Sequence, residues 1–254
     1  MNEQKKVQEL HSEIQAYKEQ VTDFIESAAH DLHAPLRKLS VLVERLIMKH
    51  ESVFDIDGKE YVHRIQACIA EMKSLIDGLT GLAGANIEAG NFTSCDLNTI
   101  VDQTLKTLRE EIEEKNISLT VDHLPTVSGN CFQYSQLFKN LFENAVKFTN
   151  NSTAKRVAVK GDELPEGQRD LLQLDQHKKY FRLEIEDNGI GFKQDYAEKI
   201  FQPFVRLHPR SMYEGSGLGL AICKKIVANH KGIIYAEGNE NRGARFVLIL
   251  PQSP

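Results

Sequence analysis

The apolar residues at the start of the chain recur at alternating gaps of three and four, the spacing of a helix with one narrow apolar seam. No helix-stop residue interrupts the pattern before Pro35. Such a helix packs either on its own domain or against a second copy, and we expect a parallel coiled coil over residues 1–24. The seam consists of Val7, Leu10, Ile14, Tyr17, Val21 and Phe24.

A second amphipathic stretch follows after a short turn at residues 52–58. Its apolar residues run from Tyr61 to Leu82 at helical spacing, and the glycines and asparagine that follow are typical of a helix end. Two long amphipathic helices with a short loop predict an antiparallel hairpin, which alone cannot bury both of its apolar stripes. We therefore expect residues 25–91 to form a four-helix bundle with a second copy, as a homodimer.

The first helical stretch carries His30 beside Asp31, with Pro35 four residues after the aspartate. Proline removes a backbone donor and clashes with the carbonyl four residues back, so a bend is expected near residues 29–31. An imidazole next to a carboxylate suits acid–base or nucleophilic chemistry. Read alone, however, a histidine on an amphipathic helix is more often a surface or satisfied core residue.

Helix-like and strand-like stretches mix over residues 92–254. Helices are expected over 96–115, 132–148, 195–201 and 218–230, and strands over 117–121, 156–160, 180–187, 232–237 and 244–250. The last two strands form a hairpin, and the polar residues 161–179 are expected as a surface insertion. The chain is thus predicted to be multi-domain, a helical hairpin followed by an α/β sandwich with one mixed sheet and helices on one face.

Composition excludes several classes of protein. A net charge of -5 and a pI of about 6.0 give no support for nucleic-acid binding. No apolar run reaches the roughly 18 residues that span a bilayer, so no membrane contact by this chain is expected. The four cysteines lack zinc or CxxC spacing, and we expect reduced thiols in a cytoplasmic protein. A longer protein, of which this chain is a fragment, could still be membrane-anchored.

Three polar motifs in the second half suit a magnesium nucleotide. Asn140, Asn144 and Lys147 share one helix face, where amide oxygens suit Mg²⁺ and lysine suits phosphate. Asp187 ends a strand, where its carboxylate can accept from an exocyclic amine such as that of adenine. Each motif also has a structural explanation, such as a polar helix face or an ordinary Asn-Gly turn.

Glycines complete these motifs. Gly189 and Gly191 follow the aspartate and allow close approach of the backbone to a ligand. The stretch Gly215-Ser216-Gly217-Leu218-Gly219 opens a helix, where free N–H groups can hold phosphate. It is neither a Walker loop nor a Rossmann fingerprint, because it lacks the lysine of the first and the preceding strand of the second.

In this order, the motifs resemble the boxes of the sensor histidine kinases of two-component signalling. The likeness covers residues 25–252 and implies a dimerisation and histidine-phosphotransfer domain at 25–91, then a Bergerat-type ATP-binding catalytic domain at 92–254. Residues 30–36 resemble the H-box, 140–148 the N-box, 187–191 the first G-box, 201–204 the F-box and 215–220 the second G-box.

The resemblance assigns expected roles. His30 is the phosphoacceptor for ATP, and Asp31 acts as general base or orients the imidazole. Asn144 holds Mg²⁺, with Asn140 and Lys147 near the phosphates. The remaining expected ATP-binding residues are Phe148 and Asp187 at the adenine, Arg206 at the γ-phosphate, and Gly189, Gly191, Gly215, Ser216, Gly217, Leu218 and Gly219. A lid is expected at residues 207–214, with Phe201 and Phe204 as its apolar anchor.

Two positions depart from the family pattern. The residue three after the histidine is often arginine, but here it is His33, which we expect to be a surface histidine without a role. The next residue is Ala34, where kinases that also dephosphorylate their partner usually have threonine or asparagine to orient water. Alanine has no such group, so efficient phosphatase activity is not expected.

The resemblance implies autophosphorylation on His30 and transfer to an aspartate of a response-regulator receiver domain, under control of an upstream sensor module. An ATPase of the wider superfamily is one alternative, although its members carry a water-activating glutamate where this chain has Asn140. A non-catalytic ATP-binding dimeric scaffold is the other. The sequence does not identify the stimulus, the regulator, or whether phosphorylation runs within or across a dimer.

Overall fold

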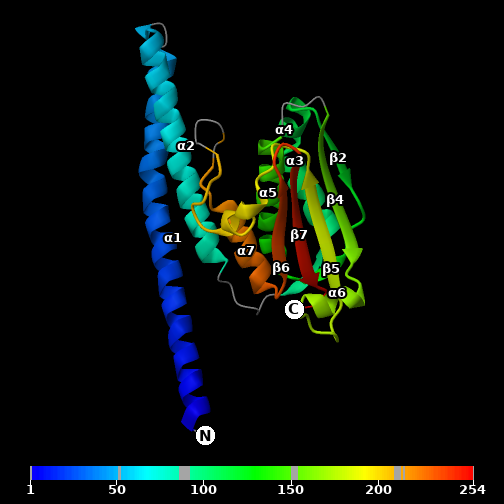
Figure 1. Ribbon diagram of the computed structural model, residues 1–254. Helices are drawn as coiled ribbons and strands as arrows, with labels where there is room; N and C mark the ends of the chain where they lie inside the picture. Colours follow the sequence, from blue (N-terminus) through cyan, green and yellow to red (C-terminus); the bar gives the residue numbers. More distant parts are fainter. Residues whose placement is uncertain are drawn as a thin grey trace. The chain divides into compact units, whose positions relative to one another are not determined.

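The computed structural model describes residues 2–50, 53–85, 92–149, 154–208, 213 and 215–253, and Figure 1 shows the course of the chain. The chain divides into two compact units, one of residues 1–86 with 214–216 and the other of residues 87–213 with 217–254. Within the described part, no helix combines the length and the apolar character needed to cross a bilayer.

The first unit is a hairpin of two helices, α1 (Asn2–His50) and α2 (Ile56–Gly84), which run antiparallel (Figure 1). Its core repeats every seven residues on both helices, because two antiparallel helices meet once every two turns. The core consists of Ala29, Leu36 and Val43 on α1 and Val62, Ile69 and Ile76 on α2. The loop is closed by the Asp55 side chain, which accepts from the Gly58 N–H at 2.7 Å.

Helix α1 continues through Pro35, and the turn at residues 29–31, where a bend was expected, remains helical. The expected coiled-coil seam lies on its first half. Leu10, Ile14, Tyr17 and Val21 are exposed there, and the side chain of Val7 lies outside the described residues. Pairing of this seam with a second copy stays a prediction.

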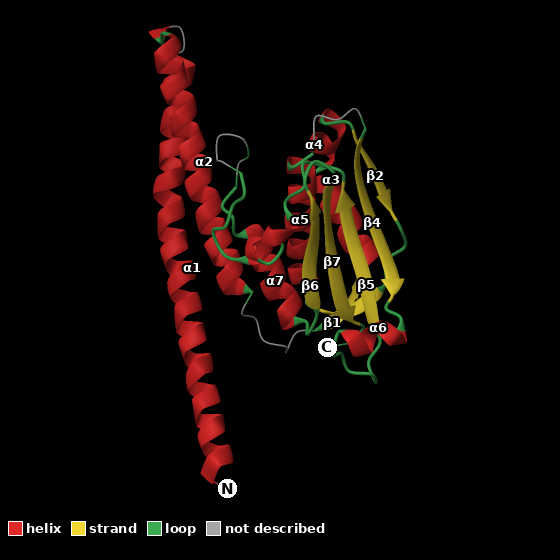
Figure 2. Ribbon diagram, in the orientation of Figure 1, coloured by secondary structure: helices red, strands yellow, loops and turns green. Residues whose placement is uncertain are grey.

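The second unit confirms the predicted α/β architecture with a mixed sheet. Five strands lie in the order β2-β4-β5-β7-β6, with β2 and β4 parallel and the other pairs antiparallel. Helices α3, α5 and α7 lie on one side of this sheet (Figure 2). The strands are β2 (Ile117–Val121), β4 (Lys155–Glu163), β5 (Tyr180–Asp187), β6 (Ile233–Asn239) and β7 (Gly243–Pro251).

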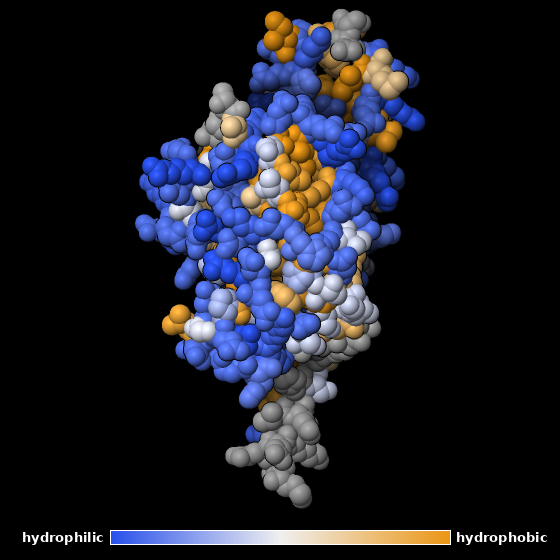
Figure 3. Space-filling model, turned by 90° about the vertical axis from the view of Figure 1, so that its right-hand side faces the viewer, coloured by the Kyte–Doolittle hydropathy of each residue, from blue (hydrophilic) through white to orange (hydrophobic). Residues whose placement is uncertain are grey.

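The three longer helices of this unit bury one face each. The major ones are α3 (Leu97–Thr107), α5 (Cys131–Lys147) and α7 (Gly219–Asn229), and the short ones are α4 (Arg109–Glu114) and α6 (Glu166–Leu171). Helix α5 places Leu137, Phe138, Leu141 and Phe142 in the core, leaving its other face for polar residues. The face of the molecule in Figure 3 is largely hydrophilic, but one larger hydrophobic patch lies above its centre.

Several local expectations were wrong. The helix expected at 195–201 is two 3₁₀ turns, Gln194–Tyr196 and Lys199–Phe201. Residues 161–179 are more than a surface insertion, because β4 extends to Glu163 and Leu164 is fully buried against Tyr180, Val247 and Ile249. Two strands, β1 (Thr93–Asp96) and β3 (Thr126–Gly129), were not predicted, because four residues are too few to show a period.

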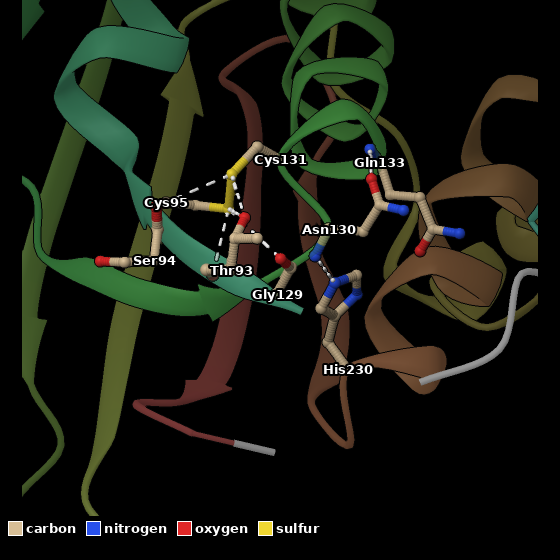
Figure 4. The surroundings of a disulfide bond; sticks show 8 residues. All are labelled: Thr93, Ser94, Cys95, Gly129, Asn130, Cys131, Gln133 and His230. Atoms are coloured by element: carbon tan, nitrogen blue, oxygen red, sulfur yellow. Dashed lines mark hydrogen bonds between the residues drawn. A yellow bond between two sulfur atoms is a disulfide. The ribbon is translucent and has the colours of Figure 1, made fainter. Parts of the chain in front are cut away.

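The expectation of four reduced thiols was also wrong. Cys95 of β1 and Cys131, the first residue of α5, form a disulfide with their Cα atoms 5.5 Å apart (Figure 4). Pairing of β1 with β3, whose end leads into α5, brings together cysteines that are 36 residues apart in sequence. Cys68 and Cys223 remain free thiols.

Candidate active site

His30 stands on the outside of the helical hairpin, with 82% of its side chain exposed. Its Nδ1 lies 3.3 Å from Oδ1 of Asp31, the next residue. A carboxylate that accepts from Nδ1–H leaves the lone pair on Nε2. The pair can therefore present Nε2 as a nucleophile to a group approaching from solvent.

His33 is not a plain surface histidine. It is half-buried, with 31% of its side chain exposed, and its Nε2 lies 3.2 Å from Oδ1 of Asp77 on α2. Sequence reasoning missed this pairing because 44 residues separate the partners and no spacing rule connects them.

The polar face of α5 carries three of the predicted ligand-binding residues. Asn140, Asn144 and Lys147 are all partly exposed on this helix, and the Lys147 Nζ lies 4.6 Å from the ring centroid of Phe148. The amide nitrogen of Asn140 is buried and makes no hydrogen bond of standard length within the described residues. A Cβ at Gly219 would lie 3.5 Å from the Asn140 Oδ1, so the first turn of α7 borders this face.

Asp187 sits where β5 ends and is only 7% exposed. Its Oδ1 accepts from the N–H of Gly189 at 2.8 Å and of Ala244 at 3.4 Å. Burial raises the pKa of this carboxyl to about 6, although the two backbone donors oppose the shift. A buried carboxylate held by one oxygen can offer the other to a donor on a ligand.

The two glycines after Asp187 allow tight packing of this loop, Gly189 onto the end of α5 and Gly191 onto Asn239 at the end of β6. A Cβ at Gly189 would lie 2.1 Å from the carbonyl oxygen of Phe148, which accepts from the Ile190 N–H at 3.0 Å. Gly191 has a φ of 61°, a backbone region that favours glycine. The end of the asparagine-bearing helix and the aspartate loop therefore form one continuous wall.

The segment after the second 3₁₀ turn lies against this wall. The Tyr213 ring is 4.9 Å from that of Phe148, and the Tyr213 carbonyl accepts from Arg206 at 2.5 Å. Phe204 donates its N–H to the carbonyl of Gly217 at 3.0 Å. Of the expected lid at 207–214, the structure describes only residues 207, 208 and 213.

Of the two phenylalanines expected to anchor the lid, only one is buried. Phe201 is buried and meets the Phe246 ring edge-on at a centroid distance of 6.4 Å, whereas Phe204 is exposed with a positive φ of 64°. One aromatic residue therefore fixes this segment to the sheet.

A second polar cluster lies where α7 ends and α5 begins, and sequence reasoning did not single it out. The fully buried His230 accepts from the Asn130 N–H through Nε2 at 3.0 Å, and its Nδ1 lies 2.8 Å from the Ile226 carbonyl oxygen (Figure 4). Burial lowers the pKa of this imidazole. The only sequence sign was a histidine after an apolar helix.

The donor set fits magnesium better than a transition metal. Within the described part of the chain, no three His, Cys, Asp or Glu side chains gather as a metal site. Mg²⁺ keeps several waters and takes few protein oxygens together with substrate phosphates. The amide oxygen of Asn144, on the open face of α5, is a donor of this kind.

The structure thus joins four of the predicted segments. Asn140 meets Gly219, Phe148 meets both the aspartate loop and Tyr213, and Gly217 meets Phe204. His30 and Asp31 belong to the helical unit, as do Gly215 and Ser216, while Leu218 opens α7 and is fully buried. Helix α5, the loop after β5 and the start of α7 thus border one another, and together they carry residues predicted to bind a nucleotide.

Comparison with known proteins agrees with this geometry. Residues 130–254 match the family described as histidine kinase-, DNA gyrase B-, and HSP90-like ATPase. Over 88% of its length the chain is 34% identical to the phytochrome-like protein Cph1 of Synechocystis and 33% identical to cyanobacterial phytochrome A of Nostoc. This chain belongs to the sensor histidine kinases. It spans 28% of the length of these two relatives.

Solved histidine kinases share the fold. The catalytic domain of histidine kinase ThkA aligns with a TM-score of 0.50 and 26% identity, covering 65% of this chain and 99% of that one. Full-length ShkA, solved in complex with AMPPNP, aligns with a TM-score of 0.63 and 22% identity over 90% of this chain and 45% of its own. The ShkA alignment thus extends over most of both units of this chain, whereas the ThkA alignment covers a single domain.

Proposed function

We propose that this chain transfers the γ-phosphoryl group of ATP to His30 and then to an aspartate of a receiver domain. The observation that carries the proposal is the His30–Asp31 pair, exposed on a helical hairpin in a chain that also matches the histidine kinase-, DNA gyrase B-, and HSP90-like ATPase family. A protein that only hydrolyses ATP has no need of an exposed imidazole with an oriented ring.

The chemistry at His30 is in-line displacement. The Nε2 lone pair forms the N–P bond as the bond from the γ-phosphorus to the bridging oxygen breaks, and ADP leaves. Asp31 holds the Nδ1 proton and stabilises the positive charge that develops on the ring. Positioning and electrostatics supply most of the rate in this kind of transfer.

The α/β unit binds the donor nucleotide. Asp187 accepts from the adenine amine, Phe148 flanks the base, and Lys147 with Arg206 meets the phosphates. Backbone N–H groups of Gly217 and Gly219, where α7 begins, hold phosphate oxygens. Asn144 holds Mg²⁺, which neutralises phosphate charge when bound.

Transfer of the phosphoryl group from His30 to an aspartate of a receiver domain completes the function. The carboxylate oxygen attacks the phosphorus of the phosphohistidine, and the neutral imidazole leaves. The exposure of His30 supports this step, because a second protein must reach the same nitrogen. Residues 25–91 serve as the phosphotransfer domain and 92–254 as the catalytic domain, with residues 1–24 as the helix that receives the upstream signal.

The proposal includes a homodimer, which is supported by apolar side chains that the hairpin leaves exposed to solvent. They repeat every seven residues on each helix and lie outside the hairpin's own core, so a second copy can cover them. These exposed residues are Leu32, Leu39 and Leu46 on α1 and Ile65, Met72 and Leu79 on α2. Light scattering should give twice the chain mass for the wild type and a lower mass for Leu39→Glu.

The test is incubation with Mg²⁺ and γ-labelled ATP. We expect acid-labile, alkali-stable label on the wild type and none on His30→Gln. His63→Gln, which alters an exposed histidine of the same hairpin, is the matched control and should label normally. Label retained by His30→Gln would move the acceptor elsewhere, and phosphate release without label would favour an ATPase.

A further inference from the structure

Polar side chains interrupt the seam along which α1 meets α2. The seam residues of α1 alternate at gaps of four and three, and all but two are apolar. They are Ala29, His33, Leu36, Ser40, Val43 and Ile47. The two polar members each meet a polar side chain of α2, since His33 Nε2 lies 3.2 Å from Asp77 Oδ1 and Lys73 Nζ donates to Ser40 Oγ at 3.0 Å.

The first of these contacts sits in a weakened turn. Pro35 has no N–H, so the carbonyl of Asp31 lacks its usual helical donor. His33 lies midway between these two residues and reaches across to the second helix. A cross-helix contact there restrains a turn that its own backbone holds less firmly.

We infer that His33 and Asp77 form a positioning bridge that sets the rotation of the helical turn presenting His30. His33 follows His30 by three residues, slightly less than one turn, so a rotation of α1 about its axis moves both rings together. The inference rests on the proposed kinase function. His33 touches no reacting atom and acts through the placement of His30.

The bridge contributes little to folding stability. Asp77 is 67% exposed, and ion pairs that open to solvent are weak because water screens them. A variant without the bridge should therefore have an unfolding midpoint within about 2 °C of that of the wild type. The rate of phosphoryl transfer is far more sensitive, since a displacement of about 1 Å can slow a positioned reaction a hundredfold.

The test compares two leucine substitutions on the same seam. His33→Leu removes the bridge but fills the seam with an apolar side chain, so it should fold at least as well as the wild type. Ser40→Leu, seven residues further along, removes the contact with Lys73 and is the matched control. We expect kcat for autophosphorylation to fall about tenfold in His33→Leu with KM for ATP within twofold, and both to stay unchanged in Ser40→Leu.

Exchange of the partners provides a rescue. Asp77→Ala should behave as His33→Leu, because neither variant can form the bridge. His33→Asp combined with Asp77→His should recover most of the rate because the pair is restored with its ends reversed. Equal losses in His33→Leu and Ser40→Leu, or no recovery in the exchanged protein, would overturn the inference.

Amide hydrogen exchange separates this inference from the proposed function. Faster exchange across residues 31–37 in His33→Leu, but not in Ser40→Leu, is expected whether or not the protein takes up label. A wild type without label would defeat the proposed function and with it the positioning role. A labelled wild type with unchanged kcat and unchanged exchange in His33→Leu would defeat the bridge alone.

Discussion

The burial of Asp187 predicts that this residue destabilises the unliganded α/β unit at neutral pH. Its pKa is raised from 3.8 to about 6 by burial, so the folded state prefers the neutral acid. A raised acid pKa gives stability that is full below pH 3.8 and lost as the pH rises through 6. Above pH 6 the ionised carboxylate lowers the free energy of unfolding by about 3 kcal/mol.

Asp187→Asn should recover this free energy at pH 7.5. The amide oxygen can still accept from Gly189 and Ala244, while the charge is gone. For a unit of this size, about 3 kcal/mol corresponds to a rise of roughly 6–12 °C in the unfolding midpoint. If Asp187 accepts from the adenine amine as proposed, the same substitution places an amide donor against that amine. ATP should then raise the unfolding midpoint of the wild type but not that of the variant.

Thermal unfolding followed by circular dichroism from pH 4 to pH 8 measures both effects. The advantage of the variant should be near zero at pH 4, grow up to pH 6 and then level off. Glu186→Gln is the matched control, because Glu186 already pairs with Arg245 at 3.3 Å and its neutralisation should bring no gain. A variant that is less stable than the wild type at pH 7.5, or a difference that ignores pH, would refute the reasoning.

Three further changes test other parts of the α/β unit. Replacement of Cys95 and Cys131 together by serine should lower the unfolding midpoint by about 5–10 °C, and reductant should do the same to the wild type only. Gly191→Ala should lower the free energy of unfolding, measured in urea, by more than about 2 kcal/mol. Gly191 has a φ of 61°, and a Cβ there would lie 2.0 Å from a carbonyl oxygen. The control Gly167→Ala, where a Cβ meets open space, should leave the free energy of unfolding unchanged. Burial lowers the pKa of His230, so its contribution to folding stability is complete above pH 6.5 and is lost as the pH falls. The difference in unfolding midpoint between the wild type and His230→Phe should therefore shrink as the pH falls below 6.5.

The sequence predicted those parts of the fold whose side chains repeat with a clear period. The strands at Ile117–Val121 and Tyr180–Asp187 were placed to the residue, since both alternate cleanly. Local motifs likewise put Asn140 on a helix and Asp187 at a strand end. The roles of these residues stay predictions.

What the sequence did not reveal depends on contacts between distant residues. The disulfide, the His33–Asp77 pair and the burial of Leu164 each join segments that only the folded chain brings together. No period or short spacing encodes such contacts, because their geometry is set by the packing of whole elements. The positive φ of Phe204 is a further case, since Pro203 before it signals a turn but a type II turn usually has glycine or asparagine where this chain has phenylalanine.

Helix α5 is fastened at both of its ends. Its first residue is covalently joined to β1 through Cys131, and the carbonyl after its last turn is held by the N–H of Ile190. The side chains of Asn140 and Asn144 thus stand on a fixed platform that a ligand cannot easily shift. Among the described contacts, His208 and Tyr213 meet this platform through the ring of Phe148, so these two residues can shift while α5 stays in place.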